Sequence, residues 1–349
     1  MKIKREKNVK FYLECLQKQK DIYLPGSFWK DAIEKISNNY IENGIENLRN
    51  FQVNIVFFVP KYGTPANGFS EEEIAEIESL ISKNLNFKQS NLIKNSLSGY
   101  YQALSDYRVF HASNTEKDIF DLTNFSESGI GSPKEFFEFN QKRFSRSSLN
   151  YLLGLSFLKR NVDDFIPKTV LEIGGGFGSL GEILGKSNLL DFRYINLDLP
   201  PLFLISEAYL KTCFGNKEDF FDHLDRRNGE IKVQELPRFT FLPNWRVEDL
   251  RGEIDLFVNF ISFQEMEPVI VHNYAKKVTE LNPKFILLRN LKEGKQKKTG
   301  KNIGVRDPVF REDYLSFFES YELLASDTDT FGYKTSDNFH SELLLLKKK

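Results

Sequence analysis

One glycine-rich stretch, Thr169-Val-Leu-Glu-Ile-Gly-Gly-Gly-Phe-Gly-Ser-Leu-Gly181, constrains the fold more than any other part of the chain. An apolar run ends in Glu172, a glycine-rich turn follows, and an apolar helical pattern begins after it. This order predicts a strand, a tight loop and a helix, because glycine permits sharp turns and close approach of a ligand to the backbone. Glu172 stands two residues before the first glycine, where its carboxylate would repel a pyrophosphate. The loop therefore favours a cationic ligand.

The pattern of strands and helices that follows residue 168 is typical of a parallel α/β sheet. Apolar runs predict seven strands, and the last two are not separated by a helix: 170–173, 193–197, 239–242, 255–260, 285–288, 321–325 and 343–346. Helical patterns lie between the earlier strands, at 179–184, 202–210, 268–281 and 311–318.

Residues 1–165 are predicted to form a mostly helical region, and residues 166–349 the cofactor-binding domain. A chain of 349 residues is long enough for two such units. The Ser70-Glu-Glu-Glu73 segment predicts a capping box, and Ser27 is expected to cap a helix that runs to Tyr40. Ser132-Pro-Lys-Glu135 is expected to cap a further helix, with proline at its first position. Residues 51–59 fit either a strand or a buried helix.

The glycine-rich stretch resembles motif I of the class I S-adenosylmethionine-dependent methyltransferases, whose cofactor carries a sulfonium and an amino group. The resemblance implies a Rossmann-like, seven-stranded sheet with an antiparallel last strand. Residues 176–181 also match the G-x-G-x-x-G pattern of dinucleotide-binding proteins, and Asp198 would serve an NAD ribose equally well. Glu172 and the adjoining last strands favour S-adenosylmethionine. A nicotinamide or flavin cofactor, and a fold that binds no cofactor, remain alternatives.

The cofactor site is expected at the carboxyl ends of the strands, where ligands bind in doubly wound sheets. Asp198 follows Gly178 by 20 residues, at the end of the second predicted strand, where a carboxylate can accept both ribose hydroxyls. The resemblance implies that Glu172 is linked to the amino group of the cofactor. Trp245 would form an adenine wall, and the backbone at Asn259 and Phe260 would follow the methionine part. The loop itself would supply Gly174, Gly175, Gly176 and Gly178.

Four further segments resemble the putative sugar O-methyltransferases of polysaccharide and glycosylated-metabolite pathways. They are 128–133 (SGIGSP), 198–201 (DLPP), 256–266 (LFVNFISFQEM) and 285–294 (FILLRNLKEG). The resemblance spans about residues 125 to 345, and the first 120 residues contribute nothing to it. It implies methylation of a sugar hydroxyl, with S-adenosylhomocysteine as product. A small non-sugar metabolite or a protein side chain as acceptor, or a non-catalytic interaction module, are the alternatives.

A sugar hydroxyl is a poor nucleophile at neutral pH, so a general base is expected near the strand ends. Two residues qualify: Glu265, which follows the fourth predicted strand, and His340, which precedes the last one. His340 could instead be a loop residue bonded to Asp337, and Glu265 could orient a ligand. Weaker substrate-contact predictions are Arg289, which an ion pair would explain equally well, and Arg146, Glu127 and Tyr333.

Composition narrows the partners of the chain. The net charge of −1 gives no global positive field for nucleic acid. Cys15 and Cys213 lack zinc or disulfide-framework spacing, no apolar run approaches the roughly 20 residues of a membrane span, and the N-terminus lacks a signal pattern. A cytoplasmic enzyme is expected, with a homodimer possible. No residue cluster has convincing metal spacing, so a divalent metal is possible but not favoured.

Overall fold

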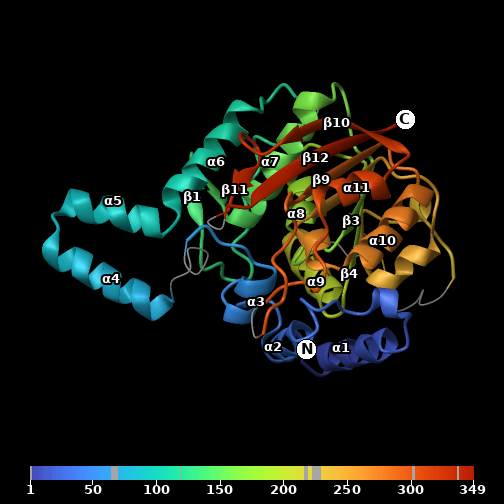
Figure 1. Ribbon diagram of the computed structural model, residues 1–349, viewed down its shortest axis with the longest axis horizontal. Coiled ribbons are helices and arrows are strands. Elements are labelled where there is room, and N and C mark those ends of the chain that lie inside the picture. The colour runs from blue at the N-terminus through green and yellow to red at the C-terminus, as the bar shows by residue number, and fades with distance from the viewer. Residues whose placement is uncertain are drawn as a thin grey trace.

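The computed structural model describes residues 2–63, 70–118, 120–215, 219–221, 229–300, 303–335 and 338–349. A twisted sheet with helices on both faces forms the body, and a pair of helices projects from one side of it (Figure 1).

The central sheet has the strand order β10-β12-β9-β8-β3-β4-β6. β12 runs antiparallel to both of its neighbours, whereas the pairs among β9, β8, β3, β4 and β6 are parallel. This confirms the predicted seven-stranded sheet and the class I methyltransferase topology. The strands are β3 (Thr169–Ile173), β4 (Arg193–Asp198), β6 (Phe239–Pro243), β8 (Leu256–Phe260), β9 (Phe285–Leu291), β10 (Tyr321–Asp327) and β12 (His340–Lys348), and the short β11 (Tyr333–Lys334) pairs with β12.

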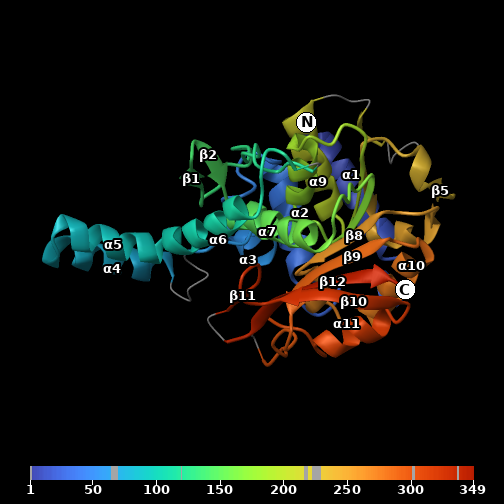
Figure 2. The same cartoon turned by 90° about the horizontal axis from the view of Figure 1, so that it is seen from above.

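Alternate side chains of each strand enter two different hydrophobic clusters, because successive residues of a strand point to opposite faces. Val170, Val258 and Leu287 pack with α7 (Arg146–Asn161), α8 (Ser179–Lys186) and α9 (Leu202–Phe214). Leu171 and Ile286 face the opposite layer, which contains α10 (Pro268–Glu280) and α11 (Arg311–Phe317). Figure 2 shows α7 and α9 on one side of the sheet and α11 on the other. The buried sheet leaves its carboxyl edge as the place for a ligand.

The mostly helical N-terminal region packs on the first of these layers. Tyr12 of α1 contacts Phe203 of α9 with ring centroids 4.8 Å apart, and one hydrophobic cluster includes residues from both parts of the chain. Its helices are α1 (Lys2–Leu16), α2 (Ala32–Asn43), α3 (Gln52–Phe57), α4 (Glu71–Asn84), α5 (Phe87–Leu97) and α6 (Tyr100–Ala112), followed by the hairpin of β1 (Phe137–Phe139) and β2 (Lys142–Phe144). Short elements complete the chain: η1 (Asp21–Tyr23), β5 (Ile231–Lys232), η3 (Val233–Glu235), η4 (Asn244–Asp249), β7 (Leu250–Arg251) and η5 (Ser262–Glu265).

Two predicted helix starts in this region are wrong. The helix expected after Ser27 begins at Ala32 with Asp31 at its N-cap, because the Ser27 side chain bonds Glu267 instead. The helix expected after Ser132 does not form there: Ser132 has a φ of 49°, and its hydroxyl donates to the carbonyl of Glu46. The next helix, α7, starts after Ser145, which caps it.

Two other local predictions are settled by the structure. The capping box of Ser70 and Glu73 at the start of α4 is confirmed. Residues 51–59, which fitted a strand or a helix, contain the short helix α3.

Candidate functional site

A cavity of about 230 Å³ lies at the carboxyl ends of β3, β4 and β8. Its walls combine the glycine-rich loop, Asp198 at the end of β4 and Glu265 after β8. The N-terminal region supplies Trp29 and residues of α3, and α7 supplies Asn150. This is the edge at which the sequence predicted the cofactor, and both parts of the chain enclose it.

The glycine-rich loop needs glycine for both backbone conformation and space. Gly174 and Gly176 have φ values of 77° and 59°, which side chains rarely adopt. A Cβ at Gly175 would lie 2.6 Å from Oε2 of Glu172 and 2.8 Å from Oδ1 of Asn196. Gly178, at φ 99°, is the N-cap of α8 and does not line the cavity within the described residues.

Glu172 lies beneath the loop, as expected, and is fully buried. Its carboxylate accepts hydrogen bonds from the hydroxyls of Tyr151, at 2.6 Å, and Tyr194. Burial raises its pKa to about 7, although the two tyrosines pull it down. Glu172 therefore supports the loop from below and is not part of the cavity wall.

Asp198 reaches the cavity from the end of β4. Its Oδ2 accepts from the amide of Gly176 at 3.0 Å, and its Oδ1 accepts from the amide of Leu199 at 2.7 Å. These bonds fix the carboxylate against the loop and leave each oxygen a second lone pair. Burial raises its pKa to about 8, with a further contribution from the negative charge of Glu172.

The chain turns sharply after β8. Ile261 has a φ of 73°, an unfavourable conformation for a β-branched residue, and it lines the cavity. The Asn259 amide donates to the carbonyl of Ile173 at 2.9 Å and accepts from the amide of Phe263 at 3.1 Å. Asn259 thus ties β8 to β3, while Phe260 forms cavity wall and stacks on Tyr151 at a centroid distance of 4.8 Å.

Glu265 is buried at the end of η5 and lines the cavity. Burial raises its pKa, which an ion pair with Lys295 (Oε1 to Nζ, 2.9 Å) and a hydrogen bond from Trp29 partly offset. Lys295 also lies 4.1 Å from the centroid of the Phe28 ring. The carboxylate is therefore held in place by groups from two distant segments.

Two amide side chains on the cavity wall have buried atoms without a hydrogen-bond partner in the described part of the chain. Both polar atoms of Asn150 and the Oδ1 of Asn244 are in this condition. An unpaired buried polar atom costs about 1–3 kcal/mol. A ligand with polar groups would relieve that cost.

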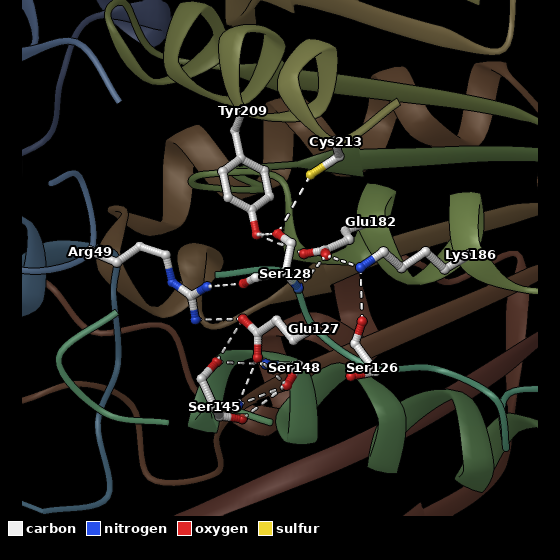
Figure 3. Close-up of polar contacts among 10 residues, drawn as sticks. All are labelled: Arg49, Ser126, Glu127, Ser128, Ser145, Ser148, Glu182, Lys186, Tyr209 and Cys213. Carbon is white, nitrogen blue, oxygen red and sulfur yellow. Dashed lines mark hydrogen bonds and ion pairs between the residues drawn. The ribbon is translucent and has the colours of Figure 1, made fainter. Parts of the chain in front are cut away.

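Glu127 lies in a buried polar network with Arg49, Ser145 and Ser148 (Figure 3). It forms an ion pair with Arg49 at 2.5 Å and accepts from the amide of Ser145 and the hydroxyl of Ser148, both at 2.7 Å. The Arg49 guanidinium lies 4.9 Å from the ring of Phe177, which belongs to the loop. Glu127 thus joins the start of α7 to this arginine, and it does not line the cavity.

The other three predicted substrate contacts lie together. The guanidinium carbons of Arg146 and Arg289 are 5.0 and 5.7 Å from the ring of Tyr333. Burial raises the pKa of Tyr333, but the two arginines outweigh it and lower the pKa below its ordinary value. Arg289 is fully buried behind Phe260, at 5.5 Å from that ring. None of the three lines the cavity in the described structure.

His340 and Trp245 also lie outside the lining of the cavity in the described residues. His340 begins β12, and its Nδ1 lies 2.5 Å from Oε1 of Glu293; Asp337, its expected partner, is outside the described residues. Trp245 packs against both hydrophobic clusters, and its neighbour Asn244 faces the cavity instead.

Several residues of the site could not be predicted from sequence motifs. Trp29, Phe57 and Asn150 come from segments without a recognisable motif, and only the folded chain brings them to the strand ends. Tyr194 could have been found, because it shares a face of β4 with Asn196 and Asp198 by the period-2 pattern of strands.

No protein-family model matches the chain, and no curated protein sequence matches it. Solved structures with a likeness to it include magnesium protoporphyrin IX methyltransferase from Synechocystis PCC 6803 with bound S-adenosylhomocysteine (TM-score 0.39, 9% identity, 58% of this chain and 83% of that one). The plantazolicin methyltransferase BamL has a TM-score of 0.39 and 10% identity, over 58% of this chain and 84% of its own. The PH0226 protein from Pyrococcus horikoshii OT3 has a TM-score of 0.38 and 12% identity, over 59% of this chain and 92% of its own. Likenesses at this level assign neither a substrate nor a reaction.

In the described ranges, no helix is long and apolar enough to cross a membrane, and no group of three or more His, Cys, Asp or Glu side chains could hold a metal ion.

Proposed function

We propose that the chain is an S-adenosylmethionine-dependent O-methyltransferase whose acceptor is a sugar hydroxyl. One observation carries the proposal: a single cavity at the carboxyl edge of the sheet has the glycine-rich loop and Asp198 on one wall and Glu265 on another. The glycine-rich loop and Asp198 suit a nucleoside with a free ribose diol, and Glu265 suits proton removal.

The residues present fit S-adenosylmethionine. Asp198 keeps acceptor capacity for the ribose hydroxyls, and the unpaired atoms of Asn150 and Asn244 offer further polar contacts. Two carboxyl groups, Asp198 and Glu265, face the cavity, and no lysine or arginine is among its described lining residues, so a positively charged ligand would meet no like charge on that lining. When bound, the cofactor supplies a methyl group attached to a positively charged sulfur.

Glu265 is our proposed general base. It lies on the cavity wall, and burial raises its pKa towards the range in which a carboxylate removes protons efficiently at neutral pH. Lys295 and Trp29 hold the carboxylate in one orientation. His340 is less suited to the role, because it pairs with Glu293 away from the cavity lining.

The sugar acceptor rests on the resemblance of residues 256–266 and 285–294 to the sugar O-methyltransferases. Glu265, in the first of these segments, lines the cavity, and Arg289, in the second, lies behind the cavity-lining Phe260. A hydroxyl acceptor also agrees with the presence of a base at the cavity wall.

Transfer of a labelled methyl group to a panel of carbohydrates, small metabolites and peptides tests the proposal. We expect label in carbohydrate, and Glu265→Gln should lower turnover by about 10²- to 10⁴-fold while S-adenosylhomocysteine affinity changes by less than about threefold. His340→Ala should keep turnover. The opposite pattern in these two variants would make His340 the base, and label confined to non-sugar acceptors would remove the sugar assignment.

A further inference from the structure

A second hollow, of about 910 Å³, adjoins the cofactor cavity. The two share Pro25, Gly26 and Ile270, so the hollow opens beside the wall that carries the proposed base. We name it the basic cleft, defined by Asp21, Lys30, Glu267, Lys297, Lys298 and Arg306.

Positive side chains outnumber negative ones in the basic cleft. Four cations face two acids, in a protein whose net charge is −1. Among the described residues, Lys298 alone of these cations forms an ion pair with an acid outside the cleft, Asp31, at 3.6 Å. The cations remain in excess even with Asp31 counted. Because field lines of one sign are concentrated in a hollow, such a cleft attracts anions.

The walls of the basic cleft are fastened to each other by Ser27. Its hydroxyl donates to Oε1 of Glu267 at 2.7 Å and accepts from the backbone amide of Arg306 at 3.1 Å. The backbone amide of Ser27 also donates to Glu267, at 3.2 Å. The N-terminal segment, the start of α10 and the connection after β9 are therefore joined at this point.

The cleft and the proposed base are close in the chain as well as in space. Glu265 lines the cofactor cavity, and Glu267, two residues later, lines the basic cleft. Lys295, which pairs with Glu265, precedes Lys297 and Lys298 on the same connection. The two hollows are therefore adjacent, with Pro25, Gly26 and Ile270 lining both.

We propose that the basic cleft binds a phosphate group of the acceptor while the hydroxyl to be methylated lies against Glu265. This inference rests on the proposed methyl-transfer function. Phosphate oxygens accept charge-assisted hydrogen bonds from lysine and arginine, which are stronger than neutral ones. Two acceptor types carry such a group: a sugar linked to a nucleoside diphosphate, and a sugar that bears a simple phosphate.

Calorimetry on the full chain, with UDP and glucose 1-phosphate as probes and glucose as the uncharged control, tests the proposal. We expect saturable binding of at least one phosphate probe, weakened by rising salt, and no binding of glucose. Lys297→Ala/Lys298→Ala and Arg306→Ala should each weaken it by at least about tenfold, since each removes charge-assisted bonds. Binding of UDP alone indicates a nucleotide-linked acceptor, and equal binding of both probes indicates recognition of phosphate itself.

The matched control is Lys347→Ala/Lys348→Ala, which removes the same charge from the exposed end of β12. Lys347 pairs with Phe285 at the start of β9, whereas the cleft lysines follow the end of that strand. The control variant should leave phosphate binding unchanged. Wild-type protein that binds S-adenosylhomocysteine but neither probe overturns the cleft assignment alone. Wild-type protein that does not bind S-adenosylhomocysteine overturns the proposed function instead.

A separate observation concerns the projecting helices α4 and α5, which we name the helical arm (residues 71–97). Figures 1 and 2 both show it extending away from the body. Among its described helical side chains, Ile81 and Ser90 alone are buried, whereas Phe87, Leu92 and Leu80 are 82%, 57% and 55% exposed. Helices this short gain most of their stability from packing, and the packing of α4 on α5 leaves these large apolar side chains exposed.

The two helices of the arm have complementary charge. The sequence of α4 has five glutamates, Glu71, Glu72, Glu73, Glu76 and Glu78, against Lys83, and that of α5 has Lys88 and Lys94 without an acid. An antiparallel pairing with a second arm places acidic α4 against basic α5 twice, through one two-fold axis. We infer that a second copy of the chain covers the arm, so that four helices pack around the exposed apolar side chains.

Light scattering over a range of protein concentrations measures the expected dimer. Phe87→Asp should weaken dimerisation by at least about tenfold, because it places a charge in the apolar contact. Leu190→Asp is the matched control, since Leu190 is 95% exposed outside the arm. A wild-type chain that stays monomeric throughout, or an equal effect of both variants, overturns the inference.

Charge reversal tests the orientation. Glu72→Lys/Glu76→Lys/Glu78→Lys leaves two glutamates against four lysines in α4, and Lys88→Glu/Lys94→Glu makes α5 acidic. Each variant should weaken the homodimer, because each sets like charges against one another twice. A mixture of the two variants should form heterodimers at nearly the wild-type affinity, since both α4–α5 contacts are then of opposite charge. A mixture no tighter than either variant alone contradicts the antiparallel pairing.

Discussion

Binding of S-adenosylhomocysteine should tighten as the pH rises from 6 to 9, because Asp198 accepts both ribose hydroxyls only after it loses its proton. Burial raises the pKa of Asp198 to about 8, and the charge of Glu172 adds to the shift. A protonated carboxyl group has a donor in place of one acceptor site. The neutral acid is therefore a poor partner for two hydroxyl donors.

The magnitude follows from the pKa. About one molecule in a hundred is ionised at pH 6 and about half at pH 8, so the affinity should rise about 50-fold, or about 2.3 kcal/mol, between these values. Above pH 9 the affinity should level off, since Asp198 is then almost fully ionised.

Calorimetric titrations of wild type and Asp198→Asn at pH 6 and pH 8.5 measure the effect. The asparagine keeps the shape of the side chain and has no proton to lose. The two proteins should bind almost equally at pH 6, and the variant should be weaker by at least about tenfold at pH 8.5. Adenosine serves as a second ligand, because it has the ribose diol without the amino group of the amino acid. A wild-type affinity that does not change with pH, or an equal loss in the variant at both pH values, would refute the reasoning.

Three further predictions concern the support of the site. The free energy of unfolding of the ligand-free protein should fall as the pH rises from about 4 to about 8. The folded-state pKa values of Glu172 and Asp198 are raised, so the folded protein binds more protons in this range than the unfolded chain does. Urea unfolding at several pH values should show a flatter profile for Glu172→Gln. Gly175→Ala should lower the free energy of unfolding by about 1–3 kcal/mol and weaken S-adenosylhomocysteine binding, since its Cβ would overlap two buried side chains. In the control Gly129→Ala the Cβ would meet only one atom, at 3.9 Å, so the free energy of unfolding should change by less than about 0.5 kcal/mol. Equal losses in urea unfolding would contradict the steric argument. Arg49→Met should lower the free energy of unfolding by about 3–5 kcal/mol, because it leaves the Glu127 carboxylate buried without its cation. The control is Glu42→Gln in the exposed pair with Lys2, which should lower it by less than about 1 kcal/mol. A similar loss of stability in both variants would refute the role of burial.

Most of the sheet could be predicted from the sequence because all of its long strands except the edge strand β10 are largely buried on both faces. Such strands are continuous apolar runs bounded by glycine, proline or polar residues, and their order after residue 168 is dictated by right-handed crossovers. The glycine-rich loop and Asp198 could be placed for the same reason, since each directly follows a strand that the pattern identifies.

The rest of the site depends on contacts that no local pattern records. Trp29 and Asn150 reach the cavity only because the N-terminal region packs against the carboxyl edge of the sheet. The cap expected at Ser27 did not form, because Glu267, far away in the chain, offers its hydroxyl a stronger acceptor. Likewise, Glu127 carries no sequence signal for its ion pair with Arg49, which joins positions 78 residues apart.

Titration of the wild-type protein with S-adenosylhomocysteine at pH 8.5, with NAD as the control ligand, tests the central claim most directly. The proposed site predicts that S-adenosylhomocysteine binds with a micromolar Kd, a binding free energy of about −8 kcal/mol, and that NAD does not bind. Binding of NAD alone would assign the glycine-rich loop and Asp198 to a dinucleotide. Binding of neither would contradict a cofactor site at the carboxyl edge of the sheet.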